Sequence, residues 1–326
     1  MSGPVRTEDV PVDVDAGRAP DTDDTGGTGG AAVEVRPSRM SQVGALRVRR
    51  ALPQRTRRTV GAWCFADHMG PVAVDGQNPA DIGPHPHIGL QTVTWLVAGE
   101  LLHHDSLGSE QLIRPGQLNL MTAGHGVVHA EESTGYRGDL HGVQLWVAQP
   151  ERTRHGPAAF EHQAELPRVE LGTATATVLV GEPAGTGERS TARHDTDGVG
   201  LDLVVRPGTA TVPLERSFEH ALVVMEGALT VAGGDGGTHV EPGQLAYLGL
   251  GRDEIGLTAT EPARVLLLGG VPFEAPVSMW WNFVARDHDE IDAARQAWAA
   301  QDEARFGPVA TTLARVPAPP TPWSPR

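Results

Sequence analysis

The sequence predicts an all-β protein made of two similar β-barrels in tandem, followed by one short helix. The first observation is a series of short apolar segments, rich in β-branched residues and separated by Gly, Pro or charged residues, which is the pattern of β-strands. The second is a weak internal repeat, and the third is that only one segment carries a helical pattern. The clearest predicted strands are residues 92–97, 142–148, 175–180, 201–205, 221–225 and 264–270.

The internal repeat supports the tandem arrangement. The motif Gly-x-Leu followed by Pro-Gly-Gln-Leu occurs twice, with 16 residues from Gly99 to Pro115 and 15 residues from Gly227 to Pro242. Two copies of one β unit that differ by a single-residue insertion are the simplest explanation.

The helix is predicted to begin near Asp287 and to end at Gly307. Asp287 and Glu290 have the spacing of a capping box, in which each side chain bonds a backbone N–H at the start of a helix. Apolar residues then recur at helical spacing, at Ile291, Ala294 and Trp298.

Both ends of the chain are predicted to lie outside the barrels. Residues 1–40 hold eight acidic and four Arg residues with few bulky apolar side chains, so they cannot bury enough surface to offset the entropy of ordering. We expect a disordered acidic tail there. Residues 311–326 form a Pro-rich tail that we expect to be extended or mobile rather than packed.

Charge excludes several classes of function. The formal net charge is −15, and all 26 basic residues are Arg. Without lysine the chain cannot form a Schiff base or a P-loop. Direct nucleic-acid binding is not expected either, because that affinity depends on clustered positive charge.

The predicted location is the cytoplasm. Cys64 is the only cysteine, so no intramolecular disulfide can form, which suits a reducing compartment. The N-terminal residues lack the basic and apolar regions of a signal peptide, and no apolar run approaches 18 residues, so no membrane association is expected. Two barrels in one chain favour a monomer.

Two short motifs indicate a metal site. His85-Pro-His87 precedes a predicted strand, and His129-Ala-Glu131 follows about forty residues later. Residues two apart on a strand point to the same face, so adjoining strands would aim three imidazoles and one carboxylate into one space. That set suits a divalent transition metal with open coordination positions. An isolated His-x-His is more often an exposed pair, and the chain has 14 His, so only the joint pattern favours a metal.

The two motifs and their surroundings resemble the cupin superfamily and, more closely, the pirin family. The resemblance covers residues 41–306. It is carried by Arg58 with Val60-Gly61, Phe65-x-Asp67-His68-x-Gly70-Pro71, the HPH at 85–87, His103-His104-Asp105-Ser106, Pro115-Gly116, Met121-Thr122-Ala123-Gly124, the HAE at 129–131 and the segment 281–298.

The resemblance implies a bicupin, that is, two jelly-roll barrels in tandem. Residues 41–190 would form the N-terminal metal-binding cupin domain, and residues 191–310 a metal-free cupin domain with the C-terminal helix. It also implies that one non-haem Fe(II) is bound by His85, His87, His129 and Glu131. The affinity order of divalent metals allows other transition metals in the same site.

Further polar residues could line the site. Gln91 stands where the first cupin motif usually has a glutamate, and His125 lies four residues before His129. A role beside the ligands or in the pocket is predicted for both and for His68, for which a turn-stabilising role fits equally well. His103 and His104 are consecutive and point to opposite faces, so at most one reaches the interior; a hydrogen-bonded structural role is expected there.

The resemblance implies two functions. In the first, the protein is a dioxygenase whose partners are an aromatic flavonol of the quercetin type and dioxygen, with Glu131 as ligand and as the base that removes the 3-hydroxyl proton. In the second, it is an iron-dependent regulator that binds a protein partner, either a transcription factor or a metabolic enzyme. A third reading is a metal-free binding module of the same fold.

Overall fold

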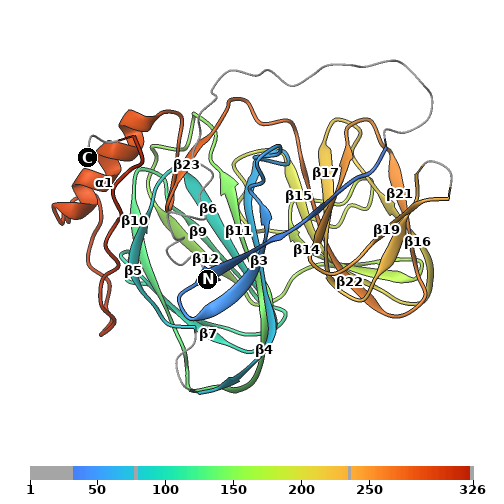
Figure 1. Cartoon of the computed structure of the whole chain (residues 1–326), viewed down its shortest axis with the longest axis horizontal. Coiled ribbons are helices and arrows are strands. Elements are labelled where there is room, and N and C mark those ends of the chain that lie inside the picture. Colours follow the sequence, from blue (N-terminus) through green and yellow to red (C-terminus); the bar gives the residue numbers. More distant parts are fainter. Residues whose placement is uncertain (1–31, 77–79, 234–235, 324–326) are drawn as a thin grey trace.

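Two β-barrels lie side by side, and the single helix lies at the end of the first barrel that faces away from the second (Figure 1). The structure is a computed structural model of the whole chain, and it describes residues 32–76, 80–233 and 236–323. It confirms the predicted all-β class, and each of the six predicted strands lies within an observed strand.

Barrel one is made of a seven-stranded and a four-stranded antiparallel sheet. Its strands are β2 (Arg39–Val43), β3 (Leu46–Leu52), β4 (Trp63–Asp75), β5 (Ile82–His87), β6 (Leu90–Ala98), β7 (Leu101–Asp105), β8 (Glu110–Ile113), β9 (Leu118–Thr122), β10 (Val127–Glu132), β11 (Arg137–Ala148) and β12 (Ala159–Gln163). The large sheet has the order β12-β9-β6-β11-β4-β3-β2, and the small one has the order β5-β10-β7-β8.

Barrel two repeats this plan with sheets in the orders β1-β20-β17-β22-β15-β14-β13 and β16-β21-β18-β19. Its strands are β1 (Glu34–Pro37), β13 (Arg168–Leu171), β14 (Ala174–Val180), β15 (Gly198–Val205), β16 (Gly208–Pro213), β17 (Glu219–Glu226), β18 (Leu229–Val231), β19 (Thr238–Val240), β20 (Gln244–Gly249), β21 (Glu254–Ala259) and β22 (Ala263–Gly270). The hairpin β23 (Ser278–Trp280) and β24 (Phe283–Ala285) then leads to α1 (His288–Ala299).

The alternation of side chains along β6 separates two cores. Leu90 and Leu96 lie in buried clusters within barrel one. Val93 and Trp95, on the opposite face, lie in a cluster that also contains Leu266 of barrel two. The seven-stranded sheets of the two barrels therefore pack against each other through apolar side chains, and the interior of barrel one lies on the other face of β6.

The predicted domain boundary at residues 190 and 191 is wrong by two strands. Barrel two begins at β13, because β13 pairs with β14 and β14 pairs with β15. The C-terminal helix, predicted as part of the C-terminal domain, packs against barrel one. Ile291 and Trp298 of α1 lie in one buried cluster with Ile88 and Val128 of barrel one.

Both predicted tails are shorter than expected. Residues 1–31 of the acidic tail lie outside the described residues. Within the rest of the predicted tail, β1 pairs with β20, and Val35 packs against the core of barrel two. The Pro-rich segment is packed as far as it is described. Val316 N–H donates to the Pro84 carbonyl at 2.9 Å, and Trp323 Nε1 donates to Asp292 at 2.9 Å.

The helix begins as predicted and ends earlier. Asp287 Oδ1 accepts from the Glu290 N–H at 2.9 Å, and Ile291, Ala294 and Trp298 are buried. The last helical residue is Ala299 rather than a residue near Gly307, because Gln301 has φ 56° and turns the chain back. No helix of the described residues has the length and apolar character needed to cross a bilayer.

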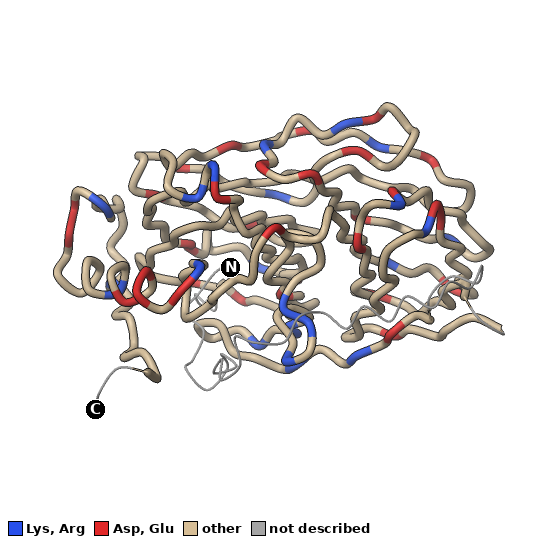
Figure 2. The backbone as a smooth tube through the Cα atoms, turned by 90° about the horizontal axis from the view of Figure 1, so that it is seen from above, with Lys and Arg blue, Asp and Glu red and all other residues tan. Residues whose placement is uncertain are grey.

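Charges of both signs are interspersed over the two barrels (Figure 2). Several of the Arg side chains are committed to ion pairs, such as Arg216 with Asp253 at 2.6 Å and Arg264 with Asp202 at 2.7 Å. Cys64 is buried inside barrel one, and burial raises the pKa of its thiol to about 12, so the thiol stays protonated at neutral pH.

Candidate metal centre

Three predicted ligands meet inside barrel one. His85 and His87 lie on β5 and His129 lies on β10, and His85 is directly opposite His129 in the antiparallel pairing. Because alternate residues of a strand share a face, the His85 and His87 rings both project to the side where His129 stands. One ring nitrogen from each lies within 4.8 Å of the other two, and all three residues are buried. We call this group the His triad.

Backbone carbonyls fix the protonation of two triad rings. His85 Nδ1 lies 2.9 Å from the Gly83 carbonyl, and His87 Nδ1 lies 2.9 Å from the Asn282 carbonyl. A carbonyl can only accept, so each Nδ1 carries the proton and Nε2 is the unprotonated nitrogen of the neutral ring. Such bonds orient metal-binding imidazoles in proteins.

A third chain of contacts orients His129. Asp105 Oδ2 accepts from His103 Nε2 at 3.1 Å, which leaves His103 Nδ1 as an acceptor for His129 Nδ1, 3.4 Å away. The other Asp105 oxygen accepts the N–H groups of Leu107 and Ser109, each at 2.9 Å. The Asp105 carboxylate is therefore held in place, and His129 Nε2 becomes the unprotonated nitrogen of its ring.

The triad fits a divalent transition metal. His87 Nε2 and His129 Nε2 are 3.1 Å apart, and both are unprotonated, so two lone pairs face each other with no proton between them. Two adjacent imidazole ligands of a six-coordinate ion, each about 2.1 Å from it, stand about 3.0 Å apart. A cation at this point would replace the repulsion between the two lone pairs with two bonds.

Burial keeps the triad neutral. Burial lowers the pKa of His85 to about 4, while the nearby Glu131 carboxylate opposes that shift. Burial and the neighbouring His85 hold the pKa of both His87 and His129 well below the ordinary value. Metal binding requires unprotonated imidazole, so the triad is ready to bind a metal at neutral pH without losing protons.

Glu131 lies beside the triad but outside its close group. It is buried on β10 two residues after His129, near enough to raise the pKa of His85. A β-bulge between His129 and Glu131 shifts the pairing with β5, so Glu131 stands opposite Ile82 on β5 and opposite His103 on β7. The structure thus brings three of the four predicted ligands together, and ligation by Glu131 remains a prediction.

The other three predicted pocket residues are elsewhere. Gln91 lies on the opposite face of β6, where its Nε2 donates to Thr122 Oγ1 at 3.0 Å. His68 Nε2 lies 2.8 Å from His141 Nε2, whose other nitrogen is 2.9 Å from Glu226 of barrel two. His125 is exposed, in the turn between β9 and β10 where Gly124 has φ 53°.

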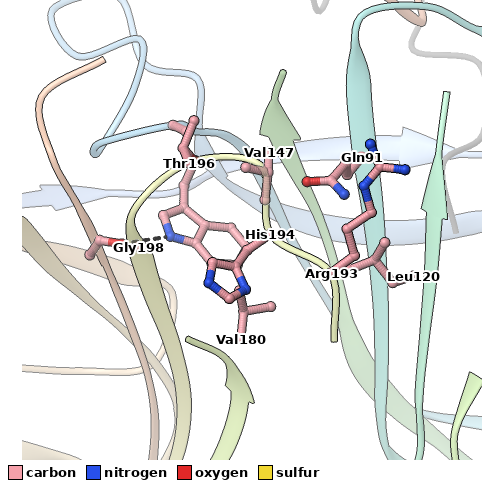
Figure 3. A pocket seen from close by; sticks show the side chains of 11 residues that line it. Gln91, Leu120, Val147, Val180, Arg193, His194, Thr196 and Gly198 are labelled. Atoms are coloured by element: carbon pink, nitrogen blue, oxygen red, sulfur yellow. Dashed lines mark hydrogen bonds between the residues drawn. The ribbon is translucent and has the colours of Figure 1, made fainter. Parts of the chain in front are cut away.

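Gln91 instead lines a cavity between the barrels (Figure 3), together with Leu120 and Val147 of barrel one and Val180 and His194 of barrel two. This cavity shares no lining residue with the triad. Gln91, which stands where cupins usually have a glutamate, therefore lies on a face of β6 that does not point to the His triad.

Sequence reasoning expected a hydrogen-bonded structural role for His103 or His104, but it missed the roles of Asp105 and Asn282. His103 does reach the interior, where its ring stacks on Phe160 with 4.5 Å between centroids. His104 is half-buried on the other face of β7, 3.7 Å from Glu132. The spacing His103-x-Asp105 places both side chains on one face of a strand, so the rule that found the ligands could have found this pair. No sequence signal links Asn282 to a ligand 195 residues away.

Comparisons with known proteins agree with this architecture. Residues 45–147 match the family model described as Pirin, and residues 201–307 match the model described as Pirin C-terminal cupin domain. A Pseudomonas aeruginosa protein that carries the name Putative quercetin 2,3-dioxygenase is 47% identical over 86% of this chain and 87% of its own length. The chain belongs to the pirin family.

Other pirins and their structures extend the comparison. A pirin-like protein of Caulobacter vibrioides is 38% identical over 81% of this chain and 91% of its own length. The crystal structure named Quercetin 2,3-dioxygenase from Acinetobacter baumannii superposes with a TM-score of 0.85 at 42% identity, covering 90% of this chain and 97% of that one. The two barrels are therefore cupin domains, as the motifs predicted.

Proposed function

We propose that the protein is a metal-dependent dioxygenase that cleaves flavonols of the quercetin type or related enols. The observation that carries the proposal is the buried His triad with its three preset protonation states. Support also comes from the names of the Pseudomonas aeruginosa relative and the Acinetobacter baumannii structure. Fe(II) in the triad, a substrate of aromatic character and a cytoplasmic location belong to the same proposal.

In this proposal some residues hold the metal ion and one also acts as the base. His85, His87, His129 and, in this proposal, Glu131 hold the ion, which when bound supplies Lewis acidity and a site for dioxygen. Glu131 accepts the proton of the flavonol 3-hydroxyl, since a buried carboxylate within hydrogen-bond reach is a suitable base. Both atoms of dioxygen enter the ester product, and the ring loses one carbon as carbon monoxide.

Aromatic side chains enclose this centre. His87 meets Trp146 edge to face at 5.2 Å, and Phe65 stacks on Trp146 at 4.0 Å between ring centroids. His103, which orients His129, stacks on Phe160. Such walls exclude water and suit a flat aromatic ligand.

The test is reconstitution of the metal-free protein with Fe(II) under anaerobic conditions, followed by dioxygen uptake and carbon monoxide release with a panel of flavonols. We expect one metal per chain and stoichiometric uptake and release with at least one flavonol. Parallel loading with Ni(II) and Mn(II) identifies the metal that supports turnover. His87→Ala should abolish both metal binding and uptake.

A matched control is His220→Leu, which removes a buried His from barrel two and should leave turnover unchanged. If the metal-loaded protein neither consumes dioxygen nor releases carbon monoxide with any flavonol, the dioxygenase proposal is wrong. A protein partner captured by the metal-loaded protein and lost in His87→Ala would then favour the regulator.

A further inference from the structure

The turn between β23 and β24 lies against the strand that carries His85 and His87. Phe283 forms a bridge with Ile88, and Val284 N–H donates to the Ile88 carbonyl at 3.2 Å. The Asn282 carbonyl accepts from His87 Nδ1 at 2.9 Å. The backbone of this turn therefore supports a triad ring directly.

The side chain of Asn282 is unexplained by the fold. Asn282 is 0% exposed, and neither its Oδ1 nor its Nδ2 has a hydrogen-bond partner among the described residues. Buried amides in folded proteins almost always bond to protein, water or ligand. An amide that can donate twice and accept twice, buried next to a metal-binding residue, indicates a ligand that is bound there.

The neighbouring residue adds an independent sign of function. Trp281 has φ 54°, a left-handed conformation that is strained for a bulky side chain. In two-residue hairpin turns such a position normally holds Gly, Asn or Asp. Strained backbone is retained where the surrounding structure enforces it, and it concentrates at ligand-binding sites.

The strand that follows Asn282 lies between the helix and the interior of barrel one. Phe283 and Ala285 lie in the cluster beneath α1. Val284 lies in the cluster inside barrel one that contains Phe65 and Trp146, and Trp146 contacts His87. Asn282 lies in the turn directly before β24, and its carbonyl contacts His87 Nδ1, so its buried amide belongs to a residue that adjoins the triad.

We propose that the Asn282 amide binds the ligand of the metal centre by donating a hydrogen bond from Nδ2 to an anionic or enolic oxygen, or to a small anion, on the open side of the triad. Asn282 is then a substrate-positioning residue whose carbonyl holds His87 and whose side chain holds the ligand. The inference rests on the proposed metal centre and specifies which ligand groups that centre accepts.

The test compares Asn282→Leu with the unaltered chain, both loaded with Co(II). Two probes are titrated anaerobically and followed by visible absorption: azide, and quercetin. Leu has nearly the shape of Asn and keeps the backbone carbonyl, so one Co(II) per chain should still bind. We expect azide and quercetin to bind at least tenfold more weakly, about 1.4 kcal/mol, while the metal-free variant is as stable as the unaltered chain or more so.

Asn119→Leu is the matched control. Asn119 is also buried in barrel one, but its Oδ1 lies 2.7 Å from His162 Nδ1. Its replacement should lower stability and leave azide affinity unchanged. Asn282→Asp keeps the shape and the acceptor but removes the N–H donor, so it should weaken azide binding at least as much as Asn282→Leu, and it serves if the Leu variant does not fold.

The inference is overturned if Asn282→Leu and Asn282→Asp bind azide as tightly as the unaltered chain. It is also overturned if Asn282→Leu lowers the stability of the metal-free protein without changing azide affinity, because the amide would then be structural. Azide binding that depends on Asn282, with no binding of quercetin, supports the inference and contradicts the proposed flavonol substrate, so the two failures are distinguishable.

Discussion

The two barrels share one plan and differ in what they place at equivalent positions. In barrel one, His85 stands opposite His129 across the β5–β10 pair. In barrel two, the corresponding pair of strands, β16 and β21, places Ala210 opposite Leu257 and Val212 opposite Ile255. All four of these residues are buried in the apolar core of barrel two.

The interior of barrel one is costly to fold. Besides the three imidazoles it contains the ion pair of Arg50 and Asp67, in which Nη2 and Oδ2 are 2.8 Å apart and both side chains are 1% exposed. Burying polar groups costs free energy unless every one is paired, and the interior of barrel two avoids most of this cost. The same scaffold thus holds the His triad in one copy and apolar packing in the other, so the two copies differ in their sites rather than in their fold.

The interior of barrel two contains a buried histidine. His220 on β17 is buried in barrel two, and neither ring nitrogen has a hydrogen-bond partner among the described residues. It has no second His opposite it, since its neighbours in the sheet are Gly249 and Gly269. A single imidazole without partners is a stability cost and lacks the companions that a metal requires.

The largest expected effect concerns metal content. His129→Leu removes one triad nitrogen and should lower metal occupancy from about one ion per chain to less than a tenth. The site would keep only two imidazoles and would lose one of its three or four metal–ligand bonds. Elemental analysis after reconstitution measures this. His220→Leu, the matching change in barrel two, should leave occupancy at one. Equal loss in both variants would contradict the assignment of the metal to barrel one.

The fold and the triad could be predicted from sequence because their signals are local. Strands such as β6 and β11 are short runs with strong β propensity, and His85, His87 and His129 follow a two-residue alternation that holds on any strand. The repeated Pro-Gly-Gln turn marked the second barrel. The family motifs then fixed which His residues belong together.

The sequence-based predictions that differ from the structure concern features that depend on contacts between distant residues. Gln91 was predicted in the pocket, but the face of a strand that points inward depends on the neighbouring sheet. The boundary at residue 190 missed β13 and β14 because nothing in their own sequence assigns them to β15. The support of His87 by Asn282 joins residues that only the return of the C-terminal segment to barrel one brings together.

The next prediction concerns the apolar core of barrel two. Leu257→Ala should lower the free energy of unfolding by about 2–5 kcal/mol, because the side chain is fully buried and leaves a cavity. Urea unfolding of the metal-free protein measures the loss. Metal occupancy should stay at one ion per chain. A parallel loss of metal would show that packing in barrel two controls the triad, against the division described above.

Acid provides a third test. Burial lowers the pKa of His220 to about 4, whereas in the unfolded chain it is about 6.5. Between these values the unfolded state binds more protons, so stability falls as pH falls from 6.5 to 4, by at most about 1.4 kcal/mol per pH unit for this one group. His220→Leu should therefore gain stability over the unaltered chain as pH decreases through this window, reaching about 2–3 kcal/mol near pH 4. Urea unfolding at each pH gives the free energy of unfolding of both proteins. A difference between them that does not change with pH would contradict the lowered pKa of His220.

The last predicted effect is the stability that the C-terminal segment, residues 313–326, contributes to barrel one. Removing residues 313–326 deletes the bond from Val316 N–H to the Pro84 carbonyl and the bond from Trp298 Nε1 to the Val316 carbonyl, both 2.9 Å. At about 1 kcal/mol each, these two bonds account for roughly 1–2 kcal/mol of the loss, and the bonds from Thr321 and Trp323 to Asp292 add to it. The loss should be confined to barrel one. Because Gly83, whose carbonyl orients His85, packs against Ala314, metal affinity should also fall a few-fold. Hydrogen exchange should accelerate in β5 and not in β16, whereas Val316→Ala, which keeps both backbone bonds, should leave both strands unchanged. Acceleration in both barrels would mean that their stabilities are coupled through the inter-barrel core, and that chemistry and packing are shared between the two copies rather than divided.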